Sequence, residues 1–594
     1  SAISCHFYTA PLPRPFPRER PAMGGSVWEV VGGKDSGGIT VRTGKELKSP
    51  EAADGRLSHG ALVAELELEG ERMRFTRLTG TGPNDGWVSL SFKSRPLLVR
   101  SGDIGSKVAE DAAELELAKA NGGITQPKPG CFRLWLLPQG SRGDVQPMLA
   151  LGVVARKKGW AVHLFSSPEN KDFVESYGIR FTSCGPDLGT MCKANETMEV
   201  DEEKMEEFKK DQAAFGMNAV GDLYNAEVRA AIADTLLAEL EKAKQEDSLP
   251  DALFFHGLSG SVAYWVWHRY GVPIFQVDYT QTCLASDEDF WKMGENMVEE
   301  SGKEVEERFG ENPFKGWSTE AVSTWAKNNI LSCTSKLLAN LFIESNEWTQ
   351  EILAAFQSRF KGPMIIDTAS QMVDLSYFGG QETLRGIQDF IDAGPKPAYV
   401  GWGSMPMTSG ALAKVVVNLK MNKLRAILLG GWAGLSRESF EQWVTEMMPD
   451  DPFGLIEYSR QNTHFTAVAP HEWLFQRCAF TVHHGGAGTT QAALRAGVPT
   501  IIMPFSFDQF MYADWVTKLG CGQQLSIKDN MDRMMDPLYS KAFRKAASDK
   551  DMIANAKWVG EEIRKECGTT AVLAHIQECI EKRARGETAG QFGA

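Results

Sequence analysis

The sequence feature that most constrains the fold is a glycine-rich turn at residues 482–490, Val-His-His-Gly-Gly-Ala-Gly-Thr-Thr. An apolar run at 479–482 leads into it and predicts a buried strand, and residues 490–495 have the pattern of a short helix. A second apolar run at 500–503 predicts the next strand. Strand, glycine turn, helix and strand together form a βαβ unit, which indicates an α/β protein.

Such a turn is suited to binding a diphosphate. Glycine lets the backbone approach an anion closely, and the free N–H groups and the dipole of the following helix offset its charge. His483 and His484 stand at the carboxyl end of the strand, where α/β sheets bind ligands. The alternative is a tight strand-to-helix turn in which the histidines only pack. The candidate phosphate contacts in this stretch are His483, His484, Gly485, Gly486, Ala487, Gly488 and Thr489.

Length and composition indicate a large protein with more than one domain. The chain has 594 residues, 43% of them hydrophobic, and a typical domain has about 150. Its net charge of −14 argues against a nucleic-acid partner, because such binders usually carry a basic surface. No apolar run approaches the roughly 20 residues of a membrane span, so we expect a cytoplasmic protein, at most peripheral on a membrane. The ten cysteines are scattered without a CxxC pair, which argues against a zinc site.

Two segments outside the expected domains have no core-forming pattern. Residues 1–25 are rich in Pro and Arg and lack the apolar segment of a signal peptide, so we expect a disordered tail, and a remnant of an organelle-targeting segment is the alternative. Residues 102–129 contain a short acidic helical run and end in a Gly- and Pro-rich stretch, which is typical of a linker.

Between these segments, residues 26–101 have the pattern of a small all-β module. Short alternating runs are separated by Gly and Asp clusters. Segments 38–42 and 86–89 resemble those of bacterial-type SH3 barrels. We expect Trp28 and Trp87 in the core of this barrel, and we expect the module to dock a protein partner or the adjacent domain.

A second βαβ unit opens with the apolar run at 132–137, which predicts a buried strand. The loop after it carries Asp144, and Pro147 is suited to the first turn of the helix that runs on to Lys158. The glycines are not spaced as G-x-G-x-x-G, which argues against a hydride-transfer enzyme. A carboxylate at the end of a strand can accept a proton from a bound hydroxyl, so Asp144 is a candidate general base. A helix N-cap or first-turn charge is the alternative.

Several motifs along the chain resemble one family. Residues 140–147, Gly-Ser-Arg-Gly-Asp-Val-Gln-Pro, look like the signature of family 1 glycosyltransferases of the sterol 3β-glucosyltransferase type. Residues 470–478 are similar to that group's P-H-D-W-L-F-P-R-C run and lead directly into the glycine turn. The resemblance extends from about Cys131 to the end and is looser at 187–392. Further matches are residues 394–395, 399–405, 425–435 and 494–504.

This resemblance implies the GT-B fold, in which two Rossmann-like lobes face each other across a cleft. Residues 130–385 would form the N-terminal lobe, which holds the acceptor. Residues 386–594, with the C-terminal helices, would form the lobe that holds a nucleotide-sugar donor. Asp144 stands where related enzymes carry a catalytic base, and His483 matches the family's phosphate-binding histidine better than His484 does.

The resemblance also implies contacts to the rest of the donor. Ser404 matches a serine near the diphosphate, with a simple turn serine as the alternative. Asp508 and Gln509 match a pair that hydrogen-bonds sugar hydroxyls. By position, Val468 and His471 are candidates to contact the base. Candidates on the acceptor side or in the first-lobe loop are Ser141, Arg142, Gly143 and Trp291.

We therefore expect an inverting glycosyltransferase that needs no metal or cofactor and moves a hexose, most simply glucose, from a UDP-sugar to the hydroxyl of a sterol or other lipid-like acceptor. Asp144 would take the hydroxyl proton, while His483, the turn amides and the helix dipole would stabilise the departing diphosphate. The alternatives are an enzyme for a different apolar natural product, a GT-B protein that binds lipid or nucleotide without turnover, and a sugar-nucleotide epimerase.

Overall fold

The chain divides into two compact units, residues 1–114 and residues 115–594. In this computed structural model, the regions of each unit that the structure describes are residues 27–33, 38–77, 82–83, 85–92, 95–100, 114–140, 142–187, 225–256, 259–278, 287–333, 335, 337, 361–365, 380–405, 407–431, 434–505, 508–526 and 534–587.

The first unit is built on a seven-stranded antiparallel sheet. Its inward side chains, such as Val41 and Phe75, are fully buried. Trp28 lies in this core, as expected, and its Nε1 donates to Glu65 Oε2 at 2.8 Å, while Trp87 is half-buried. The expected strands are present, and the likeness to an SH3 barrel stays a prediction. In spatial order the strands are β3 (Glu51–Leu57), β2 (Ile39–Arg42), β6 (Asp85–Ser89), β5 (Arg72–Arg77), β4 (Leu62–Glu69), β1 (Val27–Val30) and β9 (Leu98–Arg100), with β7 (Ser91–Phe92) and β8 (Arg95–Pro96) paired separately.

The end of the predicted linker belongs to the second unit. Residues 114–120 form a helical turn, and Leu115 and Ala118 are buried. They pack against Gly178, where an added Cβ would lie 2.9 Å from the Ala118 Cβ. The short helical run that the sequence predicts within 102–129 is thus present at this point and is anchored by two apolar side chains, and the linker itself stays a prediction. Residues 102–113 lie outside the described residues.

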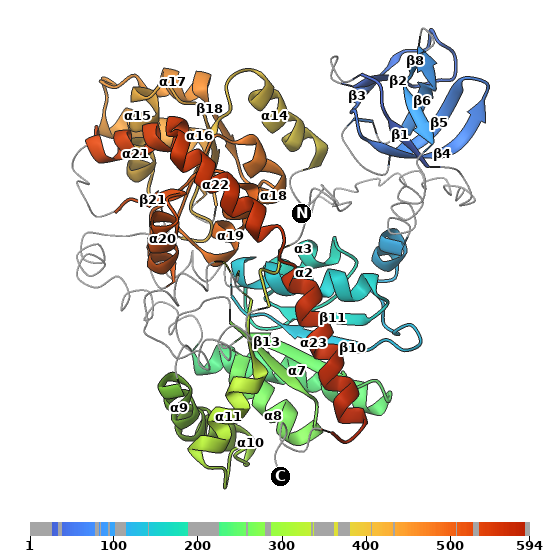
Figure 1. Cartoon of the computed structure of the whole chain (residues 1–594), viewed down its shortest axis with the longest axis vertical. Coiled ribbons are helices and arrows are strands. Elements are labelled where there is room, and N and C mark those ends of the chain that lie inside the picture. Colours follow the sequence, from blue (N-terminus) through green and yellow to red (C-terminus); the bar gives the residue numbers. More distant parts are fainter. Residues whose placement is uncertain are drawn as a thin grey trace, which may run out of the picture. The chain divides into compact units, whose positions relative to one another are not determined.

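The first lobe of the second unit is a six-stranded parallel sheet covered by helices (Figure 1). Its strand order places the first strand of the lobe at the centre, which is the Rossmann arrangement. In spatial order the strands are β12 (Arg180–Ser183), β11 (Ala161–Ser166), β10 (Arg133–Leu137), β13 (Ala252–His256), β14 (Ile274–Asp278) and β15 (Ile330–Ser332). The helices are α2 (Arg142–Lys157), α3 (Lys171–Glu175), α7 (Ala226–Gln245), α8 (Gly260–Tyr270), α9 (Asp287–Asn296), α10 (Gly302–Phe309) and α11 (Thr319–Asn329), with a π-helix at Met297–Ser301 between α9 and α10.

The second lobe repeats the same arrangement. Two parallel sheets of Rossmann order are what the sequence predicts. In spatial order the strands are β18 (Thr463–Thr466), β17 (Ala426–Leu429), β16 (Ala398–Gly401), β19 (Thr481–His483), β20 (Thr500–Ile502) and β21 (Gly522–Gln524). The helices are α14 (Gly380–Asp392), α15 (Ser409–Met421), α16 (Arg437–Met447), α17 (Leu455–Asn462), α18 (His471–Leu474), α19 (Ala487–Ala496), α20 (Gln509–Lys518), α21 (Pro537–Ser548) and α22 (Lys550–Ile563).

Helix α2 begins earlier than the sequence suggests. It starts at Arg142, so Asp144 lies in its first turn and Pro147 lies inside the helix. A proline at the sixth helical position removes only the backbone bond to the carbonyl of Gly143, and the helix continues through it. Asp144 is therefore held by a helix, which fixes its position more firmly than a loop would.

The last helix, α23 (Gly568–Ala584), crosses back to the first lobe (Figure 1). Val572 and Ile576 share one buried core with Leu134 of β10 and Phe254 of β13. Helix α23 lies within the range 386–594 that the sequence assigns to the second lobe, and its apolar face meets the first sheet. Among the described residues, no helix combines the length and the apolar character that crossing a bilayer would require.

Candidate active site

The glycine turn follows β19 and leads into α19. Gly485 has a φ of +93°, and a Cβ there would lie 2.6 Å from Ile502 Cγ2, so only glycine fits this position. Gly486 is the residue before the first turn of α19. A Cβ on Gly488 would meet no atom within 4 Å, so this side of the helix start borders open space. The turn thus combines a tightly packed side with an open side on which an anion could approach the amides.

His483 is fully buried at the end of β19. Its Nδ1 accepts a hydrogen bond from the Gly485 N–H at 3.0 Å, which assigns the ring proton to Nε2. Nε2 is buried and has no hydrogen-bond partner among the described residues. Burial, followed by the neighbouring His484 and His471, lowers the pKa of His483 well below 6.5. His483 is therefore a neutral donor with one N–H to offer.

His484 is where the loops after β16 and β19 meet. A Cβ on Gly403 would lie 3.0 Å from its Cε1, and a Cβ on Gly486 would lie 2.4 Å from its Nε2. Burial lowers the pKa of His484 to about 4, so this ring is also neutral near pH 7. Because Gly401 pairs with His483 across the sheet, the loop with Ser404 begins beside the glycine turn, and the contact of Ser404 with a diphosphate stays a prediction.

Asp508 and Gln509 lie on the other side of the glycine turn. Gln509 begins α20, and a Cβ on Gly485 would lie 3.3 Å from the Gln509 Cβ. The Gln509 Oε1 accepts from the Phe505 N–H at 2.7 Å, so part of its amide holds the end of the β20 loop. Asp508 is half-buried. The pair is thus next to the turn, and its contact with a sugar stays a prediction.

His471 begins α18, and its ring is held by aromatic residues of its own lobe. Its Nε2 lies 3.0 Å from the Tyr399 hydroxyl, and it stacks on Phe475 with ring centroids 4.6 Å apart. Burial, and after it the charge of Arg142, lowers the pKa of His471 to about 3. The Val468 carbonyl accepts from the Thr466 hydroxyl. That Val468 and His471 contact a base stays a prediction.

The first-lobe loop folds tightly around Asp144. Gly140 has a φ of +127°, and a Cβ there would lie 2.2 Å from Asp144 Oδ2. Asp144 is half-buried, Gly143 is exposed, and Ser141 lies outside the described residues. Arg142 Nε donates to Gln146 Oε1 at 3.2 Å, and the guanidinium lies 4.5 Å from the centre of the Phe173 ring.

The two lobes meet at these two loops. Helix α2 contacts α19, and Ala487, the first residue of α19, packs against the first-lobe core. The charge of Arg142 contributes to the lowered pKa of His471 and acts on Tyr399 as well, although both belong to the second lobe. The helix start that carries Asp144 therefore faces the glycine turn that carries His483.

Sequence reasoning missed two buried donors at this edge. Gln139 follows β10 and Trp402 follows β16, each within two residues of the end of the central strand of its lobe. Both side chains are almost fully buried, and neither Gln139 Nε2 nor Trp402 Nε1 has a partner among the described residues. Their shared signal is a hydrogen-bonding side chain directly after an apolar strand.

Trp291 lies on α9, is 45% exposed, and donates its Nε1 to Glu295 at 2.9 Å. Its contact with an acceptor stays a prediction. A run of mainly aromatic residues on α8, residues 264–267, belongs mostly to the core. Tyr264 and Trp267 are buried together with Phe314 and Trp325. Trp473 packs against the second-lobe core.

Two Rossmann-type lobes with facing loops define the GT-B fold of glycosyltransferases. The solved structure titled TcCGT1 in complex with UDP matches 77% of this chain and all of its own, at a TM-score of 0.53 and 14% identity, which supports the fold alone. Residues 134–218 match the glycosyltransferase family 28 N-terminal domain, and residues 456–578 match the erythromycin biosynthesis protein CIII-like C-terminal domain.

The particular relatives are enzymes named sterol 3-beta-glucosyltransferase. The one from Yarrowia lipolytica is 29% identical over 455 residues, 74% of this chain and 28% of the relative. The one from Sclerotinia sclerotiorum is 27% identical over 463 residues, 76% of this chain and 29% of the relative. The resemblance that the motifs predicted is thus confirmed. The chain spans about three tenths of the length of these curated relatives.

Proposed function

We propose that this chain is an inverting, metal-independent glycosyltransferase that moves glucose from a UDP-sugar to the hydroxyl of a sterol or other lipid-like alcohol. The observation that carries the proposal is the approach of the two lobes, with the Asp144 helix start of one facing the His483 turn of the other. The names of the relatives support a sterol as the acceptor.

Asp144 is the proposed general base. Its carboxylate would take the proton of the acceptor hydroxyl as the new bond to the sugar C1 forms. The bond from C1 to the diphosphate oxygen breaks on the opposite face, so the configuration at C1 inverts. Gly140 supports this role, because its lack of a side chain leaves room for the carboxylate at the mouth of the loop.

The departing UDP is proposed to be stabilised by neutral donors and one cation. His483 would donate its Nε2–H, and the turn amides with the α19 dipole would add further donors, each preorganised group being worth about 10²–10³ in rate. Since burial keeps both histidines neutral, they supply no positive charge. Arg142 of the other lobe would supply it, and its electrostatic effect on the pKa of His471 supports this role.

The remaining contacts with the UDP-sugar are proposed from the positions of the elements that carry these residues. Ser404 would bind the diphosphate beside His484, and Asp508 with Gln509 would bind sugar hydroxyls beside Gly485. Val468 and His471 would lie along the base. On the acceptor side, Trp291 is proposed to border the entrance, because its ring is exposed on α9.

Two wider proposals concern location and partners. We propose that the protein contacts a membrane surface peripherally from the cytoplasm, because a lipid-like acceptor would lie there. No cofactor is proposed beyond the UDP-sugar co-substrate. The antiparallel unit at the front of the chain is proposed to dock a protein partner. Its exposed Phe92 and Leu47 are candidates for that contact, with exposures of 63% and 67%.

The test is UDP release from UDP-glucose, with and without cholesterol or sitosterol, by the wild type and Asp144→Asn. The proposal expects sterol-dependent release that falls at least about 10²-fold in the variant. Release without acceptor that is unchanged in the variant would instead indicate hydrolysis or epimerisation. Binding of UDP-glucose without any turnover, across sterols and other apolar alcohols, would contradict the activity and leave a nucleotide-binding protein.

A further inference from the structure

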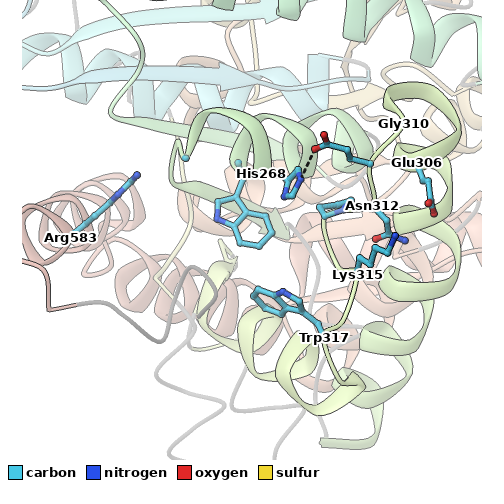
Figure 2. Close-up of a pocket in the computed structure, with 11 residues that line it drawn as sticks. His268, Glu306, Gly310, Asn312, Lys315, Trp317 and Arg583 are labelled. Atoms are coloured by element: carbon cyan, nitrogen blue, oxygen red, sulfur yellow. Dashed lines mark hydrogen bonds and ion pairs between the residues drawn. The ribbon is translucent and has the colours of Figure 1, made fainter.

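A cavity of about 560 Å³ lies in the first lobe, far along the chain from the proposed catalytic residues. It is formed where α8 and α10 end and where α23 passes, so it joins the first lobe to the helix that returns from the second. In Figure 2, Arg583 of α23 lies on one side, Lys315 and Glu306 on the other, and Trp317 between them. Its size falls within the roughly 300–1,000 Å³ of small-molecule sites.

One part of the lining is suited to a cation. Trp267 is buried, and Trp317 stands edge-on to it at 5.7 Å and 87°, so aromatic surface borders the cavity. Glu306 and Glu311 add two carboxylates, and Glu311 also pairs with His268. Aromatic faces together with carboxylates attract alkylammonium groups.

The helix ends add to this preference. Helices α8 and α10 both end at this cavity, each with a glycine in the left-handed conformation, Gly271 and Gly310. The carbonyl end of a helix carries a partial negative charge, so the end of α10 favours a cation nearby, while the end of α8 already faces the Arg583 guanidinium.

The opposite part of the lining is suited to an anion. Arg583 approaches the end of α8 so closely that a Cβ on Gly271 would lie 3.1 Å from its Nη2. Partial desolvation lowers the pKa of the Arg583 guanidinium from 12.5 although the residue is exposed, and the group stays charged near pH 7. Lys315 lies on the same side as Glu306, so the lining as a whole holds two cations and two carboxylates and has a formal charge of zero.

We propose that this cavity binds a phosphocholine group, a zwitterion whose quaternary ammonium lies against Trp317 and the carboxylates while its phosphate pairs with Arg583. A quaternary ammonium has no N–H to donate, so aromatic faces and nearby carboxylates are its usual partners. A neutral sugar would make no use of the separated charges of the lining. This proposal does not depend on the glycosyl-transfer reaction.

The test is calorimetric titration of the full chain with glycerophosphocholine, without donor or acceptor. The wild type is expected to bind saturably, and Trp317→Ala and Arg583→Gln are each expected to weaken binding at least about tenfold. Two matched controls, Trp558→Ala and Arg585→Gln, change an exposed tryptophan of α22 and a cation near Arg583 that pairs with Glu587. Both controls are expected to bind as the wild type does.

Thermal melting separates lost binding from lost folding, and Arg583→Gln changes an exposed side chain, so one variant keeps its fold. Flotation with phosphatidylcholine or phosphatidylglycerol vesicles then distinguishes the source: retention on the first alone assigns a membrane lipid, and binding of the soluble compound alone assigns a metabolite. No binding by the wild type, equal binding by all variants, or binding of methyl glucoside in its place would overturn the proposal.

Discussion

At the scale of single residues, the candidate site depends on which groups carry charge. Burial keeps His483 and His484 neutral, so the histidines can orient a diphosphate but cannot balance its charge. The Arg142 guanidinium comes from the other lobe and acts electrostatically on His471 and Tyr399. Donor binding should therefore respond to Arg142 even though the donor lobe does not contain it.

Replacing Arg142 tests this division of roles. Arg142→Gln is expected to raise the KM for UDP-glucose about tenfold or more, because a charge-assisted hydrogen bond contributes about 1.5–3 kcal/mol. Arg142→Lys should recover part of the loss, since it keeps the charge but not the planar fork. Steady-state kinetics with varied donor would measure it, with Arg308→Gln as the control, a first-lobe arginine paired with Asp234. Equal KM values in all variants would contradict the role.

At the scale of elements, the glycine turn was predictable in detail. The residues at which helices begin, and the sheets on which they pack, were not. The positions of His483, Gly485 and Gly488 are set by the conformation of the local backbone, and such local requirements can be read directly from the sequence. The start of α2 at Arg142 and the packing of α23 on the first sheet depend on surfaces far away in the chain. The buried Gln139 and Trp402 were missed because a strand-end polar residue is usually only a turn residue.

Two glycines of the same turn allow a matched comparison. Gly485→Ala is expected to destabilise the protein by about 1–3 kcal/mol and to abolish UDP binding, because its φ is +93° and a Cβ would clash with Ile502. Gly488→Ala should keep the stability, since nothing lies within 4 Å of its added Cβ. Urea unfolding would measure the stability of both variants, and titration with UDP would measure their binding. A Gly485→Ala protein as stable as Gly488→Ala would refute the packing argument.

A buried ion pair joins two helices of the second lobe. Lys414 of α15 lies 3.1 Å from Asp536, which caps α21 through the Leu538 N–H, and Lys414 also lies over the Tyr539 ring. Lys414→Met should cost about 3–5 kcal/mol, because it leaves a buried carboxylate without its partner. The double variant Lys414→Met/Asp536→Asn should recover part of that, since Asn keeps the cap. Denaturant unfolding of all three proteins measures it; a single variant as stable as the wild type would contradict the coupling.

At the scale of the whole molecule, several buried histidines set a common response to acid. Burial lowers the pKa of His471 to about 3 and of His484 and His575 to about 4, against 6.5 in the unfolded chain. Below pH 6.5 the unfolded state binds protons that the folded state excludes, so these groups favour unfolding as the pH falls. Above about pH 7 both states are neutral and the effect disappears.

The expected outcome is a free energy of unfolding that is flat above pH 7 and falls between pH 6.5 and 5, by up to about 1.4 kcal/mol per pH unit for each histidine. Urea unfolding at fixed ionic strength would measure it. His484→Gln should make the slope shallower, because one titrating group is gone. A constant free energy over this range would contradict the depressed pKa values.

Because α23 belongs to the core of the first lobe, the lobes are joined by two covalent crossings, one between β15 and α14 and one between α22 and α23. The two lobes are therefore tied together at two points of the chain rather than at one. A first-lobe fragment made by cutting before α14 would display the strip that Val572 and Ile576 normally cover. Such a fragment should bind the remainder of the chain in trans, and the pair would serve as a split reporter whose reassembly depends on α23 together with the contact between α2 and α19.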